Sequence, residues 1–430
     1  MFRKIIFWVL LLSCGPSFAV DDAFFSQSQT TVTLINEYIR LIDDAKPDYT
    51  YYDMTSWAQA ASIDFQSGFF DDWLGADVSA YGVHPLKAAE GFETRGFFDT
   101  ETDSNGDVEA KGFVKLPRYR LKQKFNVGTY DLKLYEGMHT LDDFGSLGSE
   151  ERIVDSSYYG IISTMENSDW LFKAGYLTRY SDTDMPNKEK LETADGQALD
   201  YVYTADATFK GEGYALRYYL GESQDYLRQH VFNIETDIGQ GKRLTARLFY
   251  NHGLSKWKSM SESAQPYDSD AMHFSLETRL FYPKWFVLLA YTYTDADRST
   301  SLGKFDWDLS ADSSGNRNSM ADALSTDFTN DGEHMVAVLA LRDITPSIKA
   351  GFIGRYGFGM EYEGNHMNES EFGLLGSWTP QAIDGLSLNL GGGPNYSFKR
   401  SFTNTPLLDS DGDWEKSKGY CFTFSLKYQL

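Results

Sequence analysis

The sequence predicts an all-β fold, a transmembrane antiparallel β-barrel of about 18 strands, on the basis of three observations. Apolar and polar residues alternate in short runs throughout the chain, as in "FTFSLKYQL" at 422–430. Aromatic residues make up 16% of the 430 residues and proline is rare, which favours strands over helices. Short and long polar segments alternate between the runs, which is the plan of an outer-membrane barrel.

The first predicted element is a secretory signal at residues 1–19. Basic residues precede an apolar run at 5–12, and Ala19 ends a small-residue cleavage site. A lipoprotein signal with Cys14 as the acylated residue is the alternative. Residues 20–430 then form a single barrel domain.

Predicted hairpins follow in order along the rest of the chain. The segments "SWAQAASIDF" at 56–65 and "LDYVYTADATF" at 199–209 alternate with a period of two, which is typical of strands with one apolar face. Counting such runs from residue 28 onward gives about 18 strands. Short connectors are expected near residues 67, 126, 166, 210, 240, 283, 343 and 380, and long ones near 43, 84, 137, 181, 251, 295, 360 and 401.

The last strand is expected to close the barrel, because a strand edge left unpaired in lipid has no hydrogen-bond partners. It also carries the pattern that the outer-membrane assembly machinery reads, polar-x-Gly-x-x-aromatic-x-aromatic. Ser417, Gly419, Phe422 and Phe424 match this pattern, whereas Leu430 stands where an aromatic residue is usual. An edge strand of a soluble sandwich is the alternative, but an edge this apolar would promote aggregation.

The stretch "PRYRLKQKF" places four cations, Arg118, Arg120, Lys122 and Lys124, on one strand face. At the usual rise of a strand they form a comb about 20 Å long. A cation facing lipid near mid-membrane costs roughly 2 to 4 kcal/mol, so the comb is expected to face the lumen. Two interpretations stay open: a ladder for anionic solute groups, or charge balance in which each cation pairs with an inward acid.

The same alternation places further charges in the lumen. Asp64 and Asp77 lie on neighbouring predicted strands and are expected to form an acidic patch. A pore with cations on one wall and carboxylates on another orients a dipolar solute. The other charged residues predicted to face the lumen are Arg217, Arg247, Arg279, Arg342, Arg355 and Glu277. The outward tryptophans, among them Trp57, Trp170, Trp285 and Trp378, are expected to form interfacial girdles rather than sugar-stacking sites.

From residue 56 onward the sequence resembles the OprD family of outer-membrane porins, and "DFQSGF" resembles its chitoporin branch. Similar segments follow in the family's order, among them "LKQKFNVGTYDLKLYEGM", "STDFTNDGEH" and "IGRYGFG". The resemblance implies a water-filled pore narrowed by loops, and it implies that Arg152 in "SEERIVDSSYY" belongs to a constriction loop. It also implies passive uptake of basic amino acids, small peptides, aromatic carboxylates or chitin oligosaccharides. Glycines in "LSLNLGGGPNY" replace the arginines that relatives often carry, so the solute does not carry over.

These observations predict a substrate-selective porin without catalytic residues, metal or cofactor. The seven histidines lack metal-ligand spacing, and neither a nucleophile elbow nor a phosphate-binding loop occurs. Carboxylate-bearing or zwitterionic amino acids and peptides are the expected solutes, followed by chitin-type oligosaccharides. A barrel protease or phospholipase and an adhesin-type barrel are the alternatives.

The expected location is the Gram-negative outer membrane, with both termini in the periplasm. The expected partners are outer-membrane lipid, lipopolysaccharide, the assembly machinery and small solutes. A net charge of -23 argues against nucleic acid. The oligomeric state stays open, with a homotrimer among the alternatives.

Overall fold

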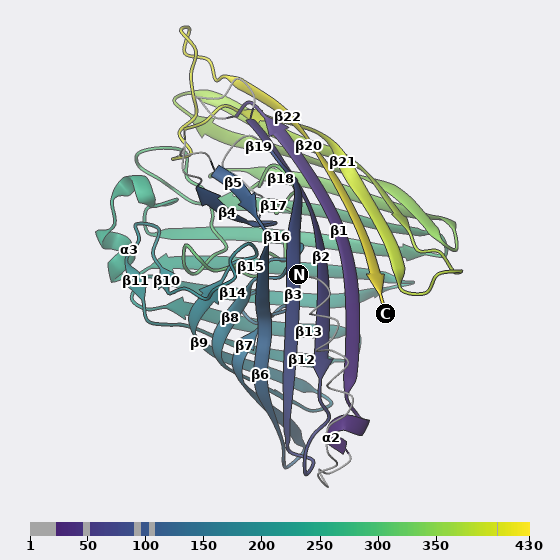
Figure 1. Cartoon of the computed structure of the whole chain (residues 1–430). Helices are drawn as coiled ribbons and strands as arrows, with labels where there is room; N and C mark the ends of the chain where they lie inside the picture. Colours follow the sequence, from purple (N-terminus) through teal and green to yellow (C-terminus); the bar gives the residue numbers. More distant parts are fainter. Residues whose placement is uncertain (1–22, 46–51, 90–95, 103–107, 402) are drawn as a thin grey trace.

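The computed structural model describes residues 23–45, 52–89, 96–102, 108–401 and 403–430. The signal predicted for residues 1–19 therefore lies outside the described residues. Eighteen strands form one closed antiparallel sheet, which confirms the predicted fold class and strand number (Figure 1). Among the described residues, no helix has the length and apolar character needed to cross a membrane.

The barrel strands follow one another around the sheet in chain order. They are β1 (Gln29–Asp43), β2 (Tyr52–Gln66), β3 (Leu74–Ala88), β6 (Phe113–Val127), β7 (Tyr130–His139), β8 (Ser157–Glu166), β9 (Trp170–Ser181), β12 (Val202–Gly211), β13 (Tyr214–Ser223), β14 (Leu227–Gly239), β15 (Lys242–Gly253), β16 (Asp270–Tyr282), β17 (Trp285–Asp295), β18 (His334–Thr345), β19 (Ile348–Tyr362), β20 (Asn365–Trp378), β21 (Leu386–Phe398) and β22 (Lys416–Gln429). The connecting segments contain β4 (Asp99–Thr102), β5 (Val108–Lys111), β10 (Leu191–Glu192), β11 (Ala198–Leu199), the helices α2 (Ala23–Ser26) and α3 (Ser255–Ser259), and the 3-10 helix η2 (Glu262–Ala264).

Strand β22 closes the barrel by pairing with β21 on one side and with β1 on the other. The register against β1 runs from Thr33 opposite Gln429 to Asp43 opposite Gly419. The expected pairing of the last strand with the first is therefore confirmed. The alternating apolar residues of β22 lie on the outer face of the barrel, where Tyr420 and Phe422 are exposed.

The two ends of the barrel differ as the connectors predicted. Two-residue turns such as Glu212–Gly213 and Pro283–Lys284 join strands at one end, and most long loops lie at the other. The long connector expected near 360 is wrong, since β19 and β20 are joined by Glu363 and Gly364 alone. Both residues have positive φ, 46° and 80°, which suits a tight hairpin turn.

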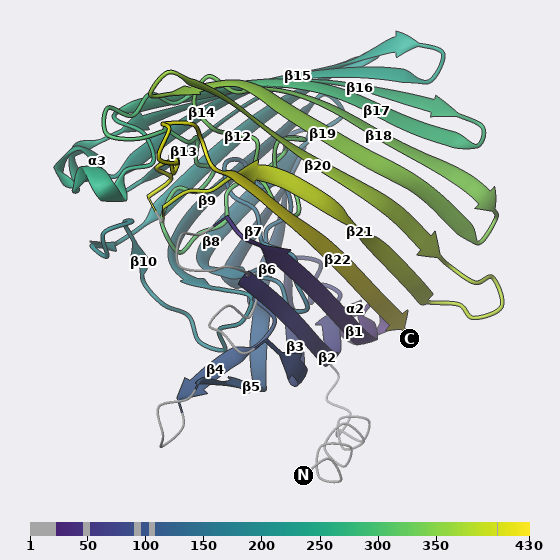
Figure 2. The ribbon, with the colours of Figure 1, turned by 90° about the horizontal axis from the view of Figure 1, so that it is seen from above.

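Two long loops fold into the barrel rather than away from it: residues 140–156, between β7 and β8, and residues 296–333, between β17 and β18. Figure 2 shows segments inside the ring of strands. Phe305 and Trp307 pack against Phe249 and His273 of the inner wall, with ring centroids 4.9–6.3 Å apart. These loops fill the lumen along β13 to β16.

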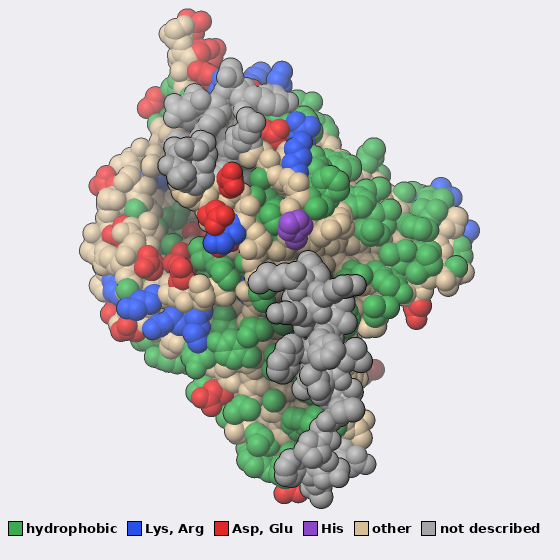
Figure 3. Space-filling view, viewed as in Figure 1, with side chains coloured by type: hydrophobic (Ala, Val, Ile, Leu, Met, Phe, Trp, Pro, Cys, Tyr) green, Lys and Arg blue, Asp and Glu red, His purple; other side chains and the backbone are tan. Residues whose placement is uncertain are grey.

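The outer surface of the barrel carries broad apolar areas (Figure 3). Many of its exposed large apolar side chains are aromatic. The four tryptophans expected in the girdles, Trp57, Trp170, Trp285 and Trp378, are among the exposed large apolar residues. Trp170, Trp285 and Trp378 stand at strand ends beside short turns. Amphipathic indole rings at this level suit the interface between hydrocarbon and headgroups.

Candidate functional site

The comb of β6 faces the lumen, and all four of its cations are paired. The ion pairs are Arg118 with Asp64, Arg120 with Asp77 (2.9 Å), Lys122 with Asp77 (2.8 Å) and Lys124 with Asp72 (2.6 Å). Lys122 Nζ also donates to the Ser67 carbonyl at 2.6 Å. The comb thus has the geometry of the charge-balance interpretation.

The expectation that Asp64 and Asp77 form an acidic patch is wrong, because both carboxylates are paired with cations of β6. Asp64 accepts from Arg118 and Ser79, and Asp77 is 1% exposed between Arg120 and Lys122. The reason is the strand register. Strand β3 pairs with β2 on one side and with β6 on the other, so the acids of β2 and β3 lie beside the cations of β6.

A fifth cation of β6, Lys115, was missed by the sequence analysis. Ser79 pairs with Arg118 but Tyr81 pairs with Lys115, so β6 contains one extra residue at this point. Such a bulge reverses the alternation, and Lys115 turns inward although its parity differs from that of the comb. Its ammonium donates to the carbonyls of Asp155, Ser181 and Asp182 at 2.5–3.2 Å. The proline at 117, which interrupts the strand pattern, was the available signal.

Most of the other predicted lumen residues do face inward, and they are paired as well. Arg217 contacts Asp206 at 2.6 Å and Asp143 at 2.7 Å. Glu277 is shared by Arg247 (3.0 Å) and Arg279 (3.1 Å). On the opposite wall, Arg355 contacts Glu371 at 2.8 Å and donates to the Met320 carbonyl of loop 296–333. These contacts hold wall and loops together.

The prediction that Arg342 faces the lumen is wrong. It pairs in register with the outward Trp285, and its guanidinium lies 5.3 Å from the centre of that ring. The lumen face of β18 carries Met335 and Ala337, which pack against Ala321 and Phe328 of loop 296–333. Both faces of β18 are therefore apolar, and alternation alone cannot distinguish them.

Loops 140–156 and 296–333 bind each other in the lumen. The Gly148 amide of loop 140–156 donates to the Ser314 carbonyl at 3.1 Å. The buried hydroxyl of Tyr158, at the start of β8, also donates to the Ser314 carbonyl, at 2.8 Å, and accepts from the Ser314 amide at 2.7 Å. Asn316 donates to Asp143 at 2.6 Å. Gly145 has a φ of +63°, and a Cβ there would lie 2.1 Å from Thr204 Oγ1, so this close approach to the wall requires glycine.

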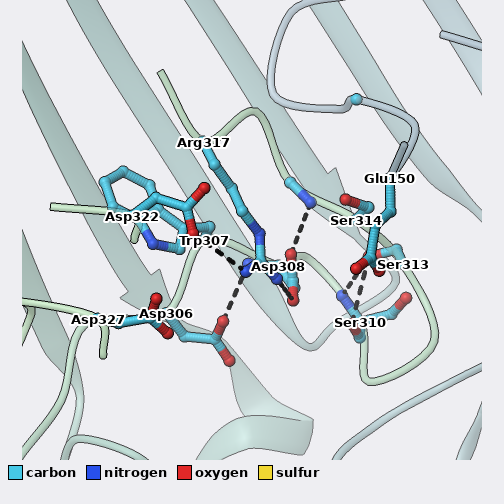
Figure 4. A network of polar contacts seen from close by, with 12 residues as sticks. Glu150, Asp306, Trp307, Asp308, Ser310, Ser313, Ser314, Arg317, Asp322 and Asp327 are labelled. Atoms are coloured by element: carbon cyan, nitrogen blue, oxygen red, sulfur yellow. Dashed lines mark hydrogen bonds and ion pairs between the residues drawn. The ribbon is translucent and has the colours of Figure 1, made fainter. Parts of the chain in front are cut away.

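Arg317 organises the tip of loop 296–333 (Figure 4). Its guanidinium contacts Asp308 at 2.9 Å and Asp322 at 3.6 Å. The Asp308 carboxylate is the main cause that raises the pKa of Arg317. Burial raises the pKa of Asp308 to about 7, and burial with the nearby charge of Asp327 raises the pKa of Asp322 to about 6.

The inward loops enclose, with the wall formed by β19 to β22, a cavity of about 870 Å³. Residues of both loops line one side of the cavity. Arg152 is one of these lining residues, and its guanidinium forms an ion pair with Glu150 at 2.6 Å. The opposite side includes Gly391, Gly392 and Gly393, which carry no side chains. The comb of β6 does not belong to the lining of this cavity.

The charge of this cavity is predominantly negative. Its lining contains eight Asp or Glu residues and three Arg residues. Within the described part of the chain, Asp142, Glu151 and Asp155 have no ion-pair partner within 4.0 Å. Burial, followed by the charge of Glu151, raises the pKa of Asp155 to about 6. These three acids were not predicted as lumen residues, although the sequence between 142 and 155 is visibly rich in acids.

The residues of the predicted assembly signal lie at the seam between β1 and β22. The Ser417 hydroxyl donates to Asp44 at 2.9 Å, and Phe422 packs outward against Tyr38 with ring centroids 6.0 Å apart. A Cβ at Gly419 would lie 2.4 Å from the Ile42 carbonyl. Phe424 lies opposite Tyr38 in the register of β22 against β1. Leu430 exchanges backbone hydrogen bonds with Val32 of β1.

Three carboxylates at the long-loop end, those of Asp295, Asp297 and Asp331, lie within 4.8 Å of one another. Oxygen atoms at this spacing are the ligand type that a hard divalent cation takes. These three acids were not among the residues singled out from the sequence.

Comparisons with known proteins agree with the barrel geometry. Residues 22–339 match the family model described as outer membrane porin, OprD family. Similar solved structures include Pseudomonas aeruginosa OccK8 (OprE), with 16% identity and a TM-score of 0.72 over 95% of this chain and 99% of that one. Acinetobacter baumannii OccAB1 has 17% identity and a TM-score of 0.73 over 96% and 100%. Pseudomonas aeruginosa OpdK, solved with vanillate, has 17% identity and a TM-score of 0.72 over 95% and 99%. No curated protein sequence matches the chain at a significant level.

Proposed function

The chain belongs to the OprD family of outer-membrane porins, and on this premise we propose that it admits small hydrophilic solutes that carry an ammonium group. The observation that carries the proposal is the cavity of about 870 Å³ with three unpaired carboxylates on its loop side. Solutes of this class include cationic and zwitterionic amino acids and small peptides. Uptake is passive and uses no cofactor.

The charge distribution supports this solute class. Rings of carboxylates favour cations in channels, because an ion pair formed in a narrow pore is less screened than one in bulk water. Asp142, Glu151 and Asp155 supply the carboxylates, and the glycines of β21 leave room on the facing wall. Arg152 and Arg355 supply cations that a solute carboxylate would meet.

The paired comb weakens the expectation that carboxylate recognition dominates. Four comb cations face three carboxylates at 2.6–2.9 Å or closer, so about one net positive charge is left on that wall. Zwitterions remain compatible with this arrangement. Solutes whose only charge is a carboxylate meet the acidic loop unfavourably.

We also propose the orientation of the barrel. The long-loop end faces the cell exterior, and the short-turn end, where β1 begins and β22 ends, faces the periplasm. This is the usual plan of bacterial outer-membrane barrels.

Planar-bilayer recording and liposome swelling test the proposal together. The purified barrel is expected to open stable channels, to select cations in a salt gradient, and to pass lysine faster than glutamate, with chitobiose as a neutral reference. A Glu151→Gln, Asp155→Asn variant is expected to lose most of that preference. The matched control, Asp409→Asn with Asp411→Asn, removes two charges from loop 399–415, outside the cavity lining. A folded but silent barrel would overturn the porin function, and faster passage of glutamate would overturn only the solute class.

A further inference from the structure

Three cations gather on the outer surface at the long-loop end of β9: Arg179, Lys188 and Lys190. Tyr158 and Tyr180 are buried inside the barrel, so Tyr159 and Arg179, which pair with each other next to them, point outward. Figure 3 shows Lys and Arg side chains in a row in this region, beside an apolar surface.

The segment after β9 brings both lysines back to Arg179. Tyr180 and Glu189 exchange backbone hydrogen bonds of 3.1 and 2.6 Å. This antiparallel register places Lys190 opposite Arg179 and Lys188 opposite Ser181, with their side chains on the outward face. One residue of β9 and two residues of the segment that follows it thus form one patch.

Aromatic rings form the floor of this patch. The Lys188 ammonium lies 3.6 Å from the ring centre of Tyr159 and donates to the Tyr119 hydroxyl at 3.0 Å. Among the residues that the structure describes, the Thr178 carbonyl is the one hydrogen-bond acceptor of the Arg179 side chain. A cation held over a ring keeps its remaining donors directed away from the protein.

The three cations are not neutralised by acids. In the ranges that the structure describes, none of them has a carboxylate within 4.0 Å, whereas the exposed Arg40 and Arg228 contact Asp53 (3.0 Å) and Glu222 (2.5 Å). Glu189 separates the two lysines in sequence, and its charge acts on Asp312 of loop 296–333. The patch keeps its positive charge in a protein of net charge -23.

We propose that Arg179, Lys188 and Lys190 bind the phosphate groups of a phosphorylated glycolipid in the outer leaflet. The site rests on the proposed orientation, which puts the long-loop end of β9 in that leaflet. The exposed side chains of Ile161 and Tyr176 lie directly below the cations on the same outward face, 47% and 50% exposed. When the phosphate group of the glycolipid binds the patch, the acyl chains of the same molecule lie over these apolar side chains. A free anion has no acyl chains and cannot make this contact.

Binding of a bisphosphorylated, acylated disaccharide to the detergent-solubilised barrel tests the site, with native mass spectrometry as the readout. One basic side chain near an anionic membrane surface changes affinity by a factor of about five. The variant Arg179→Gln, Lys188→Gln, Lys190→Gln is therefore expected to bind roughly 100-fold more weakly. The matched control, Lys210→Gln, Lys242→Gln, Lys284→Gln, removes three lysines from the short-turn end and is expected to bind as the wild type does.

Further arms make each outcome decisive. The same lipid without its phosphates is expected to bind the wild type about as weakly as the intact lipid binds the triple variant; equal binding of both lipids to the wild type would overturn the site. Equally tight binding of inorganic phosphate alone would also overturn it. If the triple variant fails to fold, Lys190→Gln and Lys190→Arg replace it, with a fivefold loss expected for the first and none for the second. Channel conductance is recorded separately, so a barrel that binds lipid but is silent would refute only the porin function.

Discussion

Asp77 is the residue on which the comb of β6 depends. It is 1% exposed, yet it receives the guanidinium of Arg120 and the ammonium of Lys122. A buried charge is tolerated when it is paired and hydrogen-bonded. Removal of its partner leaves the charge uncompensated and destabilises the protein. The comb is for this reason a structural element of the wall as well as a feature of the lumen.

Replacement of Arg120 and Lys122 by Gln is expected to destabilise the barrel by about 3–5 kcal/mol, because Asp77 is then buried without a cation. Adding Asp77→Asn should recover most of that loss. The temperature at which the folded band is lost on a gel measures both effects. Wild-type stability of the double variant would show that the pairs contribute little.

The recovered triple variant also separates the two interpretations of the comb. Charge balance predicts only a small shift of the reversal potential, since the removal of two cations and one carboxylate changes the net charge of the wall by one. An anion ladder predicts a clear move toward cation selectivity. A salt gradient at low ionic strength gives the sharpest comparison, because screening is then weakest.

Asp155 is expected to make cation selectivity dependent on pH. Its carboxyl has a pKa raised to about 6, so it is ionised at pH 7 and largely neutral at pH 5. Selectivity for cations should therefore fall as the pH falls through 6. Asp155→Asn should have lower selectivity at pH 7 and a smaller change with pH, and an unchanged pH profile in this variant would assign the titration to another group, such as Asp322.

At the scale of elements, the two inward loops act as one unit. Loop 296–333 contacts the inner wall at Tyr158, Asn251 and Arg355. It contacts loop 140–156 through Ser314, which accepts from the Gly148 amide, and through Asn316, which donates to Asp143. These hydrogen bonds to the wall and to the second loop restrict independent motion of loop 296–333. The size of the cavity therefore depends on contacts between loops as well as on the strands.

Tyr158→Phe is expected to loosen this unit. The change removes the hydroxyl to which the Ser314 amide donates, and it leaves the Ser314 carbonyl with the Gly148 amide as its remaining partner, at a cost of about 1–3 kcal/mol. Current noise of single channels should increase, and trypsin should cleave faster after Arg317. Tyr180→Phe is the matched control, since its hydroxyl bonds to Asp182 rather than to loop 296–333. Equal effects of both variants would contradict a specific link through Tyr158.

At the scale of the whole molecule, closure joins the two ends of the chain. Strand β22 is hydrogen-bonded along both of its edges, to β1 and to β21. Deletion of residues 422–430 removes most of both ladders, and the exposed strand edges cannot enter lipid. The truncated chain is expected to be absent from outer membranes in its heat-modifiable form. Wild-type amounts of that form would refute the need for closure.

The sequence by itself determined the number of strands and the closure of the barrel by the last strand. It also determined that the four comb cations of β6 face the lumen. These features follow from local alternation, because successive side chains of a strand point to opposite faces. Tight turns were harder to predict. A long connector was expected near residue 360, but Glu363 and Gly364 adopt positive φ values and join the two strands as a two-residue turn, and this backbone conformation cannot be read from alternation.

Only the tertiary structure decided which charges remain unpaired. Arg118 meets Asp64 through the register of β2, β3 and β6, and Asp143 meets Asn316 because two distant loops enter the same lumen. Alternation also failed for Arg342, where the inward loop makes both faces of β18 apolar. Alternation reports which face of one strand is apolar, whereas pairing depends on the distance between elements that only closure and loop packing bring together.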